Sequence, residues 1–218
     1  MTKILDQRDC SVNEKEGDLL FDLARKCTGK GVIIEIGSWK GKSTIRLAKG
    51  SKLGKRCKIY AIDPHVGSPQ HTKIVGKVWT FDQFKKNIKE AEVEDIVVPI
   101  VATSEEAAKR WSGKPIELLW IDGNHDYEFV KQDIFLWKKY LINGGIIALH
   151  DTLKGGAKEA VDKFIYWGKE FRNIRFKSSI IFAEKTGKLS SFEKLENFFA
   201  FCFREGYLFL RKIYYKFM

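Results

Sequence analysis

The sequence predicts an α/β protein built on a doubly wound, largely parallel sheet with helices on both faces. Short apolar runs alternate with amphipathic helical segments through most of the chain, which is the pattern of repeated strand–helix units. Most of these runs are continuously apolar, as expected for strands covered by helices on both sides. Glycine and polar residues follow several runs directly, and they mark one edge of the sheet as the place for a ligand.

Apolar periodicity, glycines and capping residues give the expected elements. Strands are predicted at residues 32–36, 57–62, 96–101, 116–121, 146–149, 174–176 and 180–183. Helices are predicted at residues 13–27, 81–91, 127–140 and 157–167, with two more ending at residues 48 and 111. The last two strands are joined by only a few residues and are expected to form an antiparallel hairpin at one edge.

A glycine-containing turn after the first strand is the centre of the predicted site. Its segment, residues 31–44, reads GVIIEIGSWKGKST. A P-loop would need glycine where Ile36 stands, and a dinucleotide fingerprint would need glycine where Trp39 stands. Two interpretations stay open: a turn around a nucleoside without a pyrophosphate, and a plain strand-to-helix turn. Glu35 falls near the carboxyl end of the strand, where ligands bind in open α/β sheets.

Two glycines and two hydroxyl residues shape the same turn. Gly37 and Gly41 would let the backbone turn tightly and approach a ligand closely. Ser43 or Thr44 is expected to cap the helix that follows.

Further polar residues follow the second and third strands. Asp63 stands near the usual distance for an acidic residue that binds ribose hydroxyls, and the alternative is a turn residue before Pro64. Thr103 and Ser104 either cap a short helix or touch an adenine edge, and the cap is the favoured interpretation. A long loop at residues 65–78 has the character of a lid or substrate loop.

The fourth and fifth strands end in the most polar segments of the chain. Asp122 and His125 follow one strand, and His150 and Asp151 follow the next. Burying so many titratable groups without partners would be costly, so a functional site explains them better than packing does.

Length and composition predict the number of domains and the cellular compartment of the protein. With 218 residues, 44% of them hydrophobic, the chain is expected to form one domain at residues 1–189 and a tail at residues 190–218. The four cysteines lie far apart without a C-x-x-C pair, which favours reduced thiols and a cytoplasmic protein over disulfides or structural zinc. Residues 1–9 lack the apolar region of a signal peptide.

Four segments together resemble a known family. They are EIGSWKGKST at residues 35–44, YAIDPHVG at 60–67, LLWIDGNHDYEFVKQDIFLW at 118–137 and GGIIALHDT at 144–152. This set resembles class I S-adenosylmethionine-dependent methyltransferases (EC 2.1.1), specifically the small O-methyltransferases similar to macrocin O-methyltransferase. The resemblance implies a Rossmann-like sheet of seven strands, mostly parallel with an antiparallel last strand.

The resemblance also implies a cofactor site for S-adenosylmethionine. Its methionine and ribose part would be lined by Glu35, Gly37, Ser38 and Gly41, its ribose hydroxyls held by Asp63, and its adenine flanked by Thr103 or Ser104. Asp122 would begin the reaction end of the same site.

At the reaction end, the resemblance implies a general base and a metal. His125 would take the proton of the acceptor hydroxyl, a role that suits an imidazole because it titrates near neutral pH. Asp122 and Asp151 would hold a divalent magnesium ion. His150 stands where some metal-dependent relatives carry an acidic residue, and imidazole is a poor ligand for magnesium, which points toward a borderline ion or no metal.

The tail differs from the rest of the chain, because aromatic and basic residues alternate along it. One interpretation is an interfacial helix on anionic lipid, which would place the protein peripherally on the inner face of the membrane. The other is a helix that docks on the domain or on a second subunit of a homo-oligomer.

Two functions from different classes are compatible with these features. The first is methyl transfer to a hydroxyl of a small molecule, plausibly a sugar unit of a glycan or glycolipid. The second is a nucleic-acid-binding or non-catalytic nucleoside-binding protein that uses the net charge of +11. No basic module with stacking aromatics precedes the core, so nucleic acid is not the expected partner. IDGNH stands where amine methyltransferases carry an Asn-Pro-Pro-Tyr-type motif, which favours an oxygen acceptor.

Overall fold

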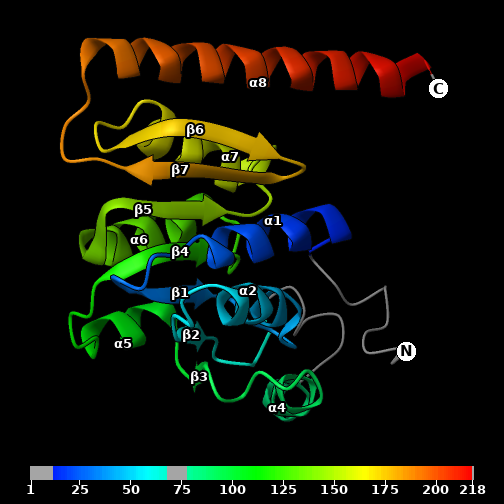
Figure 1. Cartoon of the computed structure of the whole chain (residues 1–218). Coiled ribbons are helices and arrows are strands. Elements are labelled where there is room, and N and C mark those ends of the chain that lie inside the picture. The colour runs from blue at the N-terminus through cyan, green and yellow to red at the C-terminus, as the bar shows by residue number, and fades with distance from the viewer. Residues whose placement is uncertain (1–11, 68–77, 218) are drawn as a thin grey trace.

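The structure is a computed structural model, and it describes residues 12–67 and 78–217 (Figure 1). Its strands are β1 (Val32–Ile36), β2 (Ile59–Ile62), β3 (Val97–Ile100), β4 (Ile116–Ile121), β5 (Leu141–Leu149), β6 (Phe171–Lys177) and β7 (Ile180–Lys185). Its helices are α1 (Glu14–Arg25), α2 (Lys42–Leu53), α4 (Phe81–Glu90), α5 (Ser104–Lys109), α6 (Tyr127–Trp137), α7 (Gly155–Val161) and α8 (Ser191–Phe217). Two short helical turns, η2 (Lys138–Tyr140) and η3 (Asp162–Tyr166), follow α6 and α7.

The seven strands form one sheet in the order β3-β2-β1-β4-β5-β7-β6. All neighbours from β3 to β5 pair in parallel, whereas β7 runs antiparallel to both β5 and β6. The predicted Rossmann-like sheet with an antiparallel last strand is therefore confirmed, and so is the hairpin at one edge.

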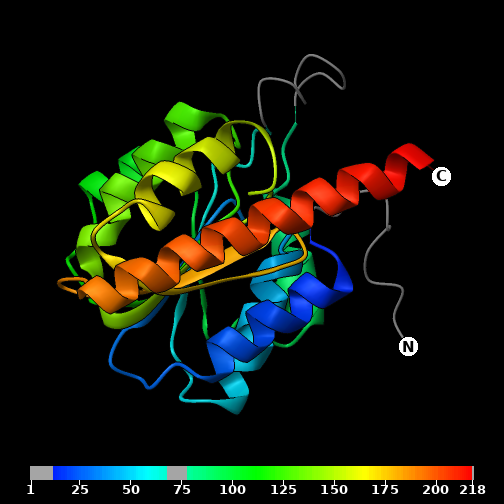
Figure 2. The same ribbon diagram turned by 90° about the horizontal axis from the view of Figure 1, so that it is seen from above.

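Helices cover both faces of this sheet, and each face has its own apolar core. One core joins the sheet to α1, α2 and α4, and the other joins it to α5, α6 and α7. Figure 2, seen from above, shows these two groups of helices on opposite sides of the strands. Alternate residues of β1 divide between the cores, with Ile33 on the first side and Ile34 on the second.

The register of the central strands places their ends in one row. Ile36 of β1 pairs with Ile62 of β2 and with Ile121 of β4, and Ile121 pairs with Leu149 of β5. The residues that follow these four positions consequently meet at one edge of the sheet, as the sequence predicts for a ligand site.

The start of α2 differs from the prediction. Gly41, in the left-handed conformation at φ 89°, is the N-cap, and it makes no side-chain cap. The hydroxyls of Ser43 and Thr44 instead donate hydrogen bonds of 2.5 Å to the two carboxylate oxygens of Glu35. The expected cap was wrong because both hydroxyls satisfy the fully buried side chain of Glu35 and so do not reach the amides of the first helical turn.

Two element boundaries also differ from the prediction. The second helix continues past residue 48 to Leu53, and Gly50 lies inside it because α1 packs so closely that a Cβ there would come within 2.1 Å of the carbonyl oxygen of Phe21. The fifth strand begins at Leu141, so the glycines at 144 and 145 belong to the strand and are not a helix stop. Most of the predicted lid loop, at residues 68–77, lies outside the described residues, as do residues 1–11.

The tail forms a single 27-residue helix, α8, along the edge strand β6 (Figure 1). Asn197 Nδ2 donates a 2.8 Å hydrogen bond to the carbonyl of Phe171 in β6. The fully buried Arg204 pairs with Asp162 and lies 4.5 Å from the centroid of the Tyr166 ring. Across residues 12–67 and 78–217, no helix is long and apolar enough to span a membrane.

At Gly37, the turn after β1 approaches the end of β4 closely. Its φ is +87°, and a Cβ would lie only 2.3 Å from the carbonyl oxygen of Asp122. Its amide donates to the carbonyl of Ile62, and the amide of Asp122 donates to the carbonyl of Ile36. The first turn of the site can therefore pack against the end of β4 only when residue 37 has no side chain.

We expect Gly37→Ala to lower the free energy of unfolding by about 2–4 kcal/mol, because it combines a left-handed backbone with a steric clash. Gly144→Ala is the matched control: its φ is +83° but a Cβ would meet nothing within 4 Å. That variant should lose only about 1–2 kcal/mol. Urea unfolding of both variants measures the difference, and equal losses would contradict the close approach.

Candidate active site

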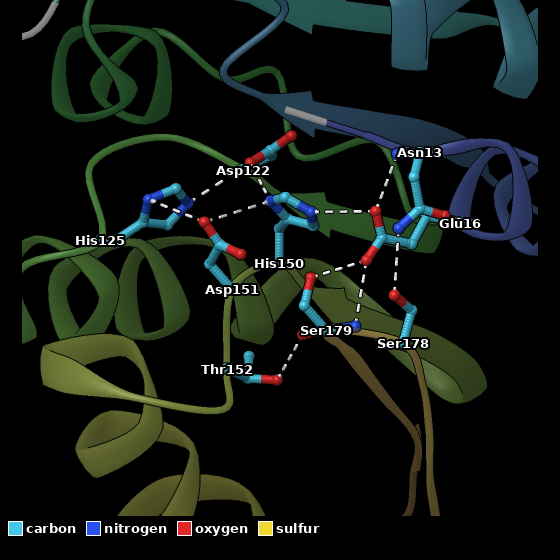
Figure 3. Close-up of polar contacts among 9 residues, drawn as sticks. All are labelled: Asn13, Glu16, Asp122, His125, His150, Asp151, Thr152, Ser178 and Ser179. Atoms are coloured by element: carbon cyan, nitrogen blue, oxygen red, sulfur yellow. Dashed lines mark hydrogen bonds and ion pairs between the residues drawn. The ribbon is translucent and has the colours of Figure 1, made fainter. Parts of the chain in front are cut away.

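Four side chains converge at the carboxyl ends of β4 and β5 (Figure 3). His150 Nδ1 lies 2.9 Å from Asp122 Oδ1, and His125 Nε2 lies 3.4 Å from the same oxygen. Asp151 Oδ2 lies 3.8 Å from His125 Nδ1 on the other side of the ring. The structure therefore brings together the four residues that the sequence places at adjacent strand ends.

A fifth residue, Glu16 of α1, joins the cluster from the far end of the chain. Glu16 Oε2 lies 3.4 Å from His150 Nε2. Its other oxygen accepts hydrogen bonds from the amide of Ser179 at 3.0 Å and from its hydroxyl at 2.7 Å. Sequence reasoning missed Glu16, although its place on the apolar stripe of α1, in line with Leu19 and Leu20, is the signal that could have found it.

The charges of this cluster support one another. Burial opposes the charge on His150, but the carboxylates of Asp122 and Glu16 outweigh it and raise its pKa to about 10. Burial likewise opposes the charge of each carboxylate. His125 and His150 outweigh it for Asp122, and hydrogen bonds from His150, Asn13 and Ser179 outweigh it for Glu16, so both pKa values fall below their usual range. At neutral pH His150 is thus an imidazolium held between two carboxylates.

Exposure separates the members of the cluster into two groups. The side chains of His150 and Asp122 are only 2% and 4% exposed, whereas those of His125 and Asp151 are 40% and 46% exposed. His125 is therefore the imidazole that a small molecule can reach, and the buried pair beneath it forms its support.

The residues at this edge do not fit a magnesium ion. Asp122, His125 and His150 offer one carboxylate oxygen and two ring nitrogens within 4.8 Å of one another, whereas magnesium prefers oxygen ligands. The ring of His150 also lies between the carboxylates of Asp122 and Asp151, at 2.9 and 3.9 Å, where a cation would need to sit.

The ends of β1 and β2 form the adjoining half of the edge. Asp63 accepts hydrogen bonds from the amides of Trp39 at 2.7 Å and His65 at 2.6 Å, so it fixes the turn after β1. The hydroxyl of Ser38 is buried without a hydrogen-bond partner among the described residues. A buried, unpaired hydroxyl in such a turn is a candidate contact for a ligand.

Glu35 lies one strand position below this turn and is fully buried. Burial raises its pKa to about 8, although its hydrogen bonds from Ser43 and Thr44 act in the opposite direction. Both of its oxygens are engaged with α2, and its assignment to cofactor binding stays a prediction.

Thr103 and Ser104 both have protein partners. Thr103 caps α5 in a reciprocal capping box with Glu106, as the favoured interpretation expects. Ser104 Oγ accepts a 2.9 Å hydrogen bond from Trp137 Nε1. Beside it lies Asp133, whose pKa burial raises to about 6 although Ser104 acts in the opposite direction. Sequence reasoning did not single out Asp133, and the adenine contact of Thr103 or Ser104 stays a prediction.

A family model described as a methyltransferase domain matches residues 34–152, more than half of the chain. The chain belongs to this family. The matched residues run from β1 to the segment after β5, and they contain both the glycine turn and the polar cluster. The family predicted from the sequence is thereby confirmed, and the narrower likeness to macrocin O-methyltransferase stays a prediction.

A curated protein that is similar to this chain has low sequence identity to it. An uncharacterized protein of Acanthamoeba polyphaga mimivirus is 27% identical over 121 residues, which cover 54% of this chain and 50% of that protein. The matched segment thus spans about half the length of this relative.

The solved structures that share the fold include two O-methyltransferases. The O-methyltransferase TomG of Streptomyces achromogenes, in complex with S-adenosylmethionine, is 16% identical with a TM-score of 0.62, covering 81% of this chain and 82% of that one. CalS11, a TDP-rhamnose 3′-O-methyltransferase of calicheamicin biosynthesis, is 17% identical with a TM-score of 0.57, covering 77% and 76%. At these identities, the likeness shows the fold of the methyltransferase domain.

The buried His150 predicts a specific pH dependence of stability. Its folded-state pKa of about 10 lies above its ordinary value of 6.5, so its contribution is fully present below pH 6.5 and is lost as the pH rises through 10. We expect His150→Gln to lower the free energy of unfolding by about 3 kcal/mol at pH 6 and by clearly less at pH 10.

Chemical unfolding at a series of pH values measures this difference. Glu16→Gln serves as the companion background, because removing this carboxylate should lower the folded-state pKa of His150. In that background, the stability loss caused by His150→Gln should disappear at a lower pH than it does in the wild-type background. A loss that is the same at pH 6 and pH 10 would show that His150 is neutral in the folded protein.

Proposed function

We propose that this protein is an S-adenosylmethionine-dependent O-methyltransferase that acts on a hydroxyl of a small molecule, with a sugar unit as the favoured acceptor. One observation carries the proposal: an accessible imidazole, His125, is held against a buried carboxylate, Asp122, beside the glycine turn of a methyltransferase-domain chain. This pairing provides a proton acceptor where an acceptor hydroxyl would meet the cofactor.

The turn after β1 and the end of β2 would hold the cofactor. Gly37 and Gly41 leave room for close approach, Ser38 offers an unpaired hydroxyl, and the Asp63 carboxylate would accept from the ribose hydroxyls. Similarity in fold to TomG, which is solved with S-adenosylmethionine, supports this assignment.

When bound, S-adenosylmethionine supplies a methyl group that is activated by its positively charged sulfur. His125 Nε2 faces Asp122, which leaves Nδ1 as the ring atom that takes the acceptor's proton as its oxygen attacks the methyl carbon. The cofactor would leave as the neutral thioether that keeps the electrons of the carbon–sulfur bond, and His125 would hold the acceptor's proton on Nδ1. Asp122 and Asp151, on either side of the ring, then stabilise the imidazolium.

His150 makes this arrangement independent of a metal in the proposed mechanism. Its positive charge balances Asp122 and Glu16, so the buried acids need no divalent cation. Most of the remaining rate enhancement would come from positioning the oxygen in line with the methyl group and sulfur. The magnesium ion implied by the family resemblance would accordingly be dispensable.

Calorimetric titration tests cofactor binding without knowledge of the acceptor. We expect S-adenosylmethionine to bind with measurable heat and with the same affinity in EDTA and in magnesium. Asp63→Ala should weaken binding by about tenfold or more, because ribose loses a charged acceptor. Asp95→Ala is the control and should leave the affinity unchanged, because Asp95 pairs with Lys52 and Arg56 on the surface. Absence of heat would favour the alternative of a nucleic-acid-binding or non-catalytic binding protein with the same fold.

Turnover tests the role of His125. With nucleotide sugars and small phenols as trial acceptors, His125→Ala should lower the rate of S-adenosylhomocysteine formation by about 100-fold or more. The affinity for S-adenosylmethionine should stay within about twofold of wild type, because His125 contributes a proton acceptor and not a cofactor contact. An unchanged rate would contradict the general-base assignment even if cofactor binding is confirmed.

A further inference from the structure

The outward face of α8 is a continuous apolar band. Eight apolar side chains lie along this side of the helix, and the charged residues between them in the sequence point to other sides. The eight are Phe192, Leu195, Phe199, Cys202, Phe203, Phe209, Leu210 and Ile213. All eight are exposed. At 1.5 Å per residue the band extends over roughly 30 Å. Soluble domains rarely leave so long an apolar surface without a partner.

The opposite side of the helix already packs on the body of the protein. Asn197, Arg204 and the partly buried Phe201 lie on that side and contact β6 and η3. One helix therefore has two faces with different partners: the first covers the sheet edge, and the second faces away from it (Figures 1 and 2). Docking of the helix on its own domain cannot account for the second face.

Charges on the flanks of the band indicate what covers it. From residue 206 to residue 217 the charged residues are all basic, namely Arg211, Lys212 and Lys216. Earlier in the helix, Glu193 pairs with Arg172, and Glu205 pairs with Arg204 and Lys158. Glu196 adds one exposed negative charge in that half, so the positive charge is concentrated in the last turns. An apolar face bordered by lysines and arginines complements the acyl and headgroup regions of a bilayer with acidic lipids. A second copy of the chain would bring the same positive flank.

We propose that α8 is an interfacial helix that binds the protein to an anionic lipid surface through the face formed by Phe192, Phe199, Phe203, Phe209 and Ile213. The helix lies in the plane of the interface, because it is too polar overall to cross the bilayer. The basic residues of its last turns contact the headgroups. This binding is separate from methyl transfer and does not depend on it.

Vesicle co-sedimentation of the full chain tests the proposal. We expect binding to phosphatidylcholine vesicles that contain phosphatidylserine, weak binding to phosphatidylcholine alone, and loss of binding as the salt concentration rises. No binding to the acidic vesicles, or equal binding to both kinds at all salt concentrations, would overturn the proposal.

Two sets of variants separate the apolar and the charged contributions. The triple variant Phe199→Ser, Phe203→Ser and Phe209→Ser should lower vesicle partitioning by about tenfold or more. Leu53→Ser on α2 is the control, because Leu53 and Phe203 are both 72% exposed. The pair Lys212→Glu and Lys216→Glu should lower partitioning by about tenfold, whereas Lys85→Glu and Lys86→Glu on α4 should leave it nearly unchanged.

Independent measurements show whether the variants fold and whether the face binds a second copy instead. Thermal unfolding should change only slightly in the variants, since the altered side chains are exposed and only the ring of Phe203 also contacts the domain, at Phe176 of β6. Sedimentation velocity without lipid reports the oligomeric state. If wild type is a dimer that the triple variant converts to a monomer, and neither binds vesicles, the face is a subunit interface and the lipid proposal is wrong.

Discussion

The parallel register of β1, β4 and β5 is the constraint on which the rest of the site depends. It aligns Ile36, Ile121 and Leu149, so the next residue of each strand emerges at the same edge. The amide of Asp122 donates to Ile36 and the amide of His150 donates to Ile121, which locks the two polar ends in place beyond the last paired residues. Side chains from distant parts of the sequence become neighbours because the backbone leaves them no other position.

That alignment creates an electrostatic difficulty, and α1 resolves it. Asp122 is buried at the junction of three strand ends, and an unpaired carboxylate there would cost several kcal/mol. His150 supplies the opposite charge, but its second nitrogen would then lack a partner in the core. Glu16 accepts from that nitrogen and is itself held by Ser179 of the β6–β7 turn. The N-terminal helix, the sheet centre and the edge hairpin are thereby joined through three ionised groups.

The sequence was sufficient for the architecture because strands buried on both faces leave continuous apolar runs, and the boundaries of β4 were predicted to the residue. It was insufficient where a tertiary contact overrides a local signal. Glycine disfavours a helix interior, yet Gly50 lies inside α2 because its missing side chain admits the backbone of α1. Ser43 and Thr44 are residue types that commonly cap helices, yet here their hydroxyls donate hydrogen bonds to Glu35. Glu16 was missed for a related reason: its partner is 134 residues away, and only the folded register brings the two together.

The last helix combines a structural role with a surface that the domain does not use. An edge strand exposes unpaired backbone groups, and α8 covers β6, where Asn197 satisfies the carbonyl of Phe171. A helix of about two thirds of this length would be enough for that purpose, because the described side chains beyond residue 208 are all exposed. The additional turns are rich in aromatic and basic residues, a composition that raises the risk of aggregation unless something covers it. Protection of the sheet edge thus explains where the helix begins and which face it buries, while its length and its outward face require a partner outside the domain.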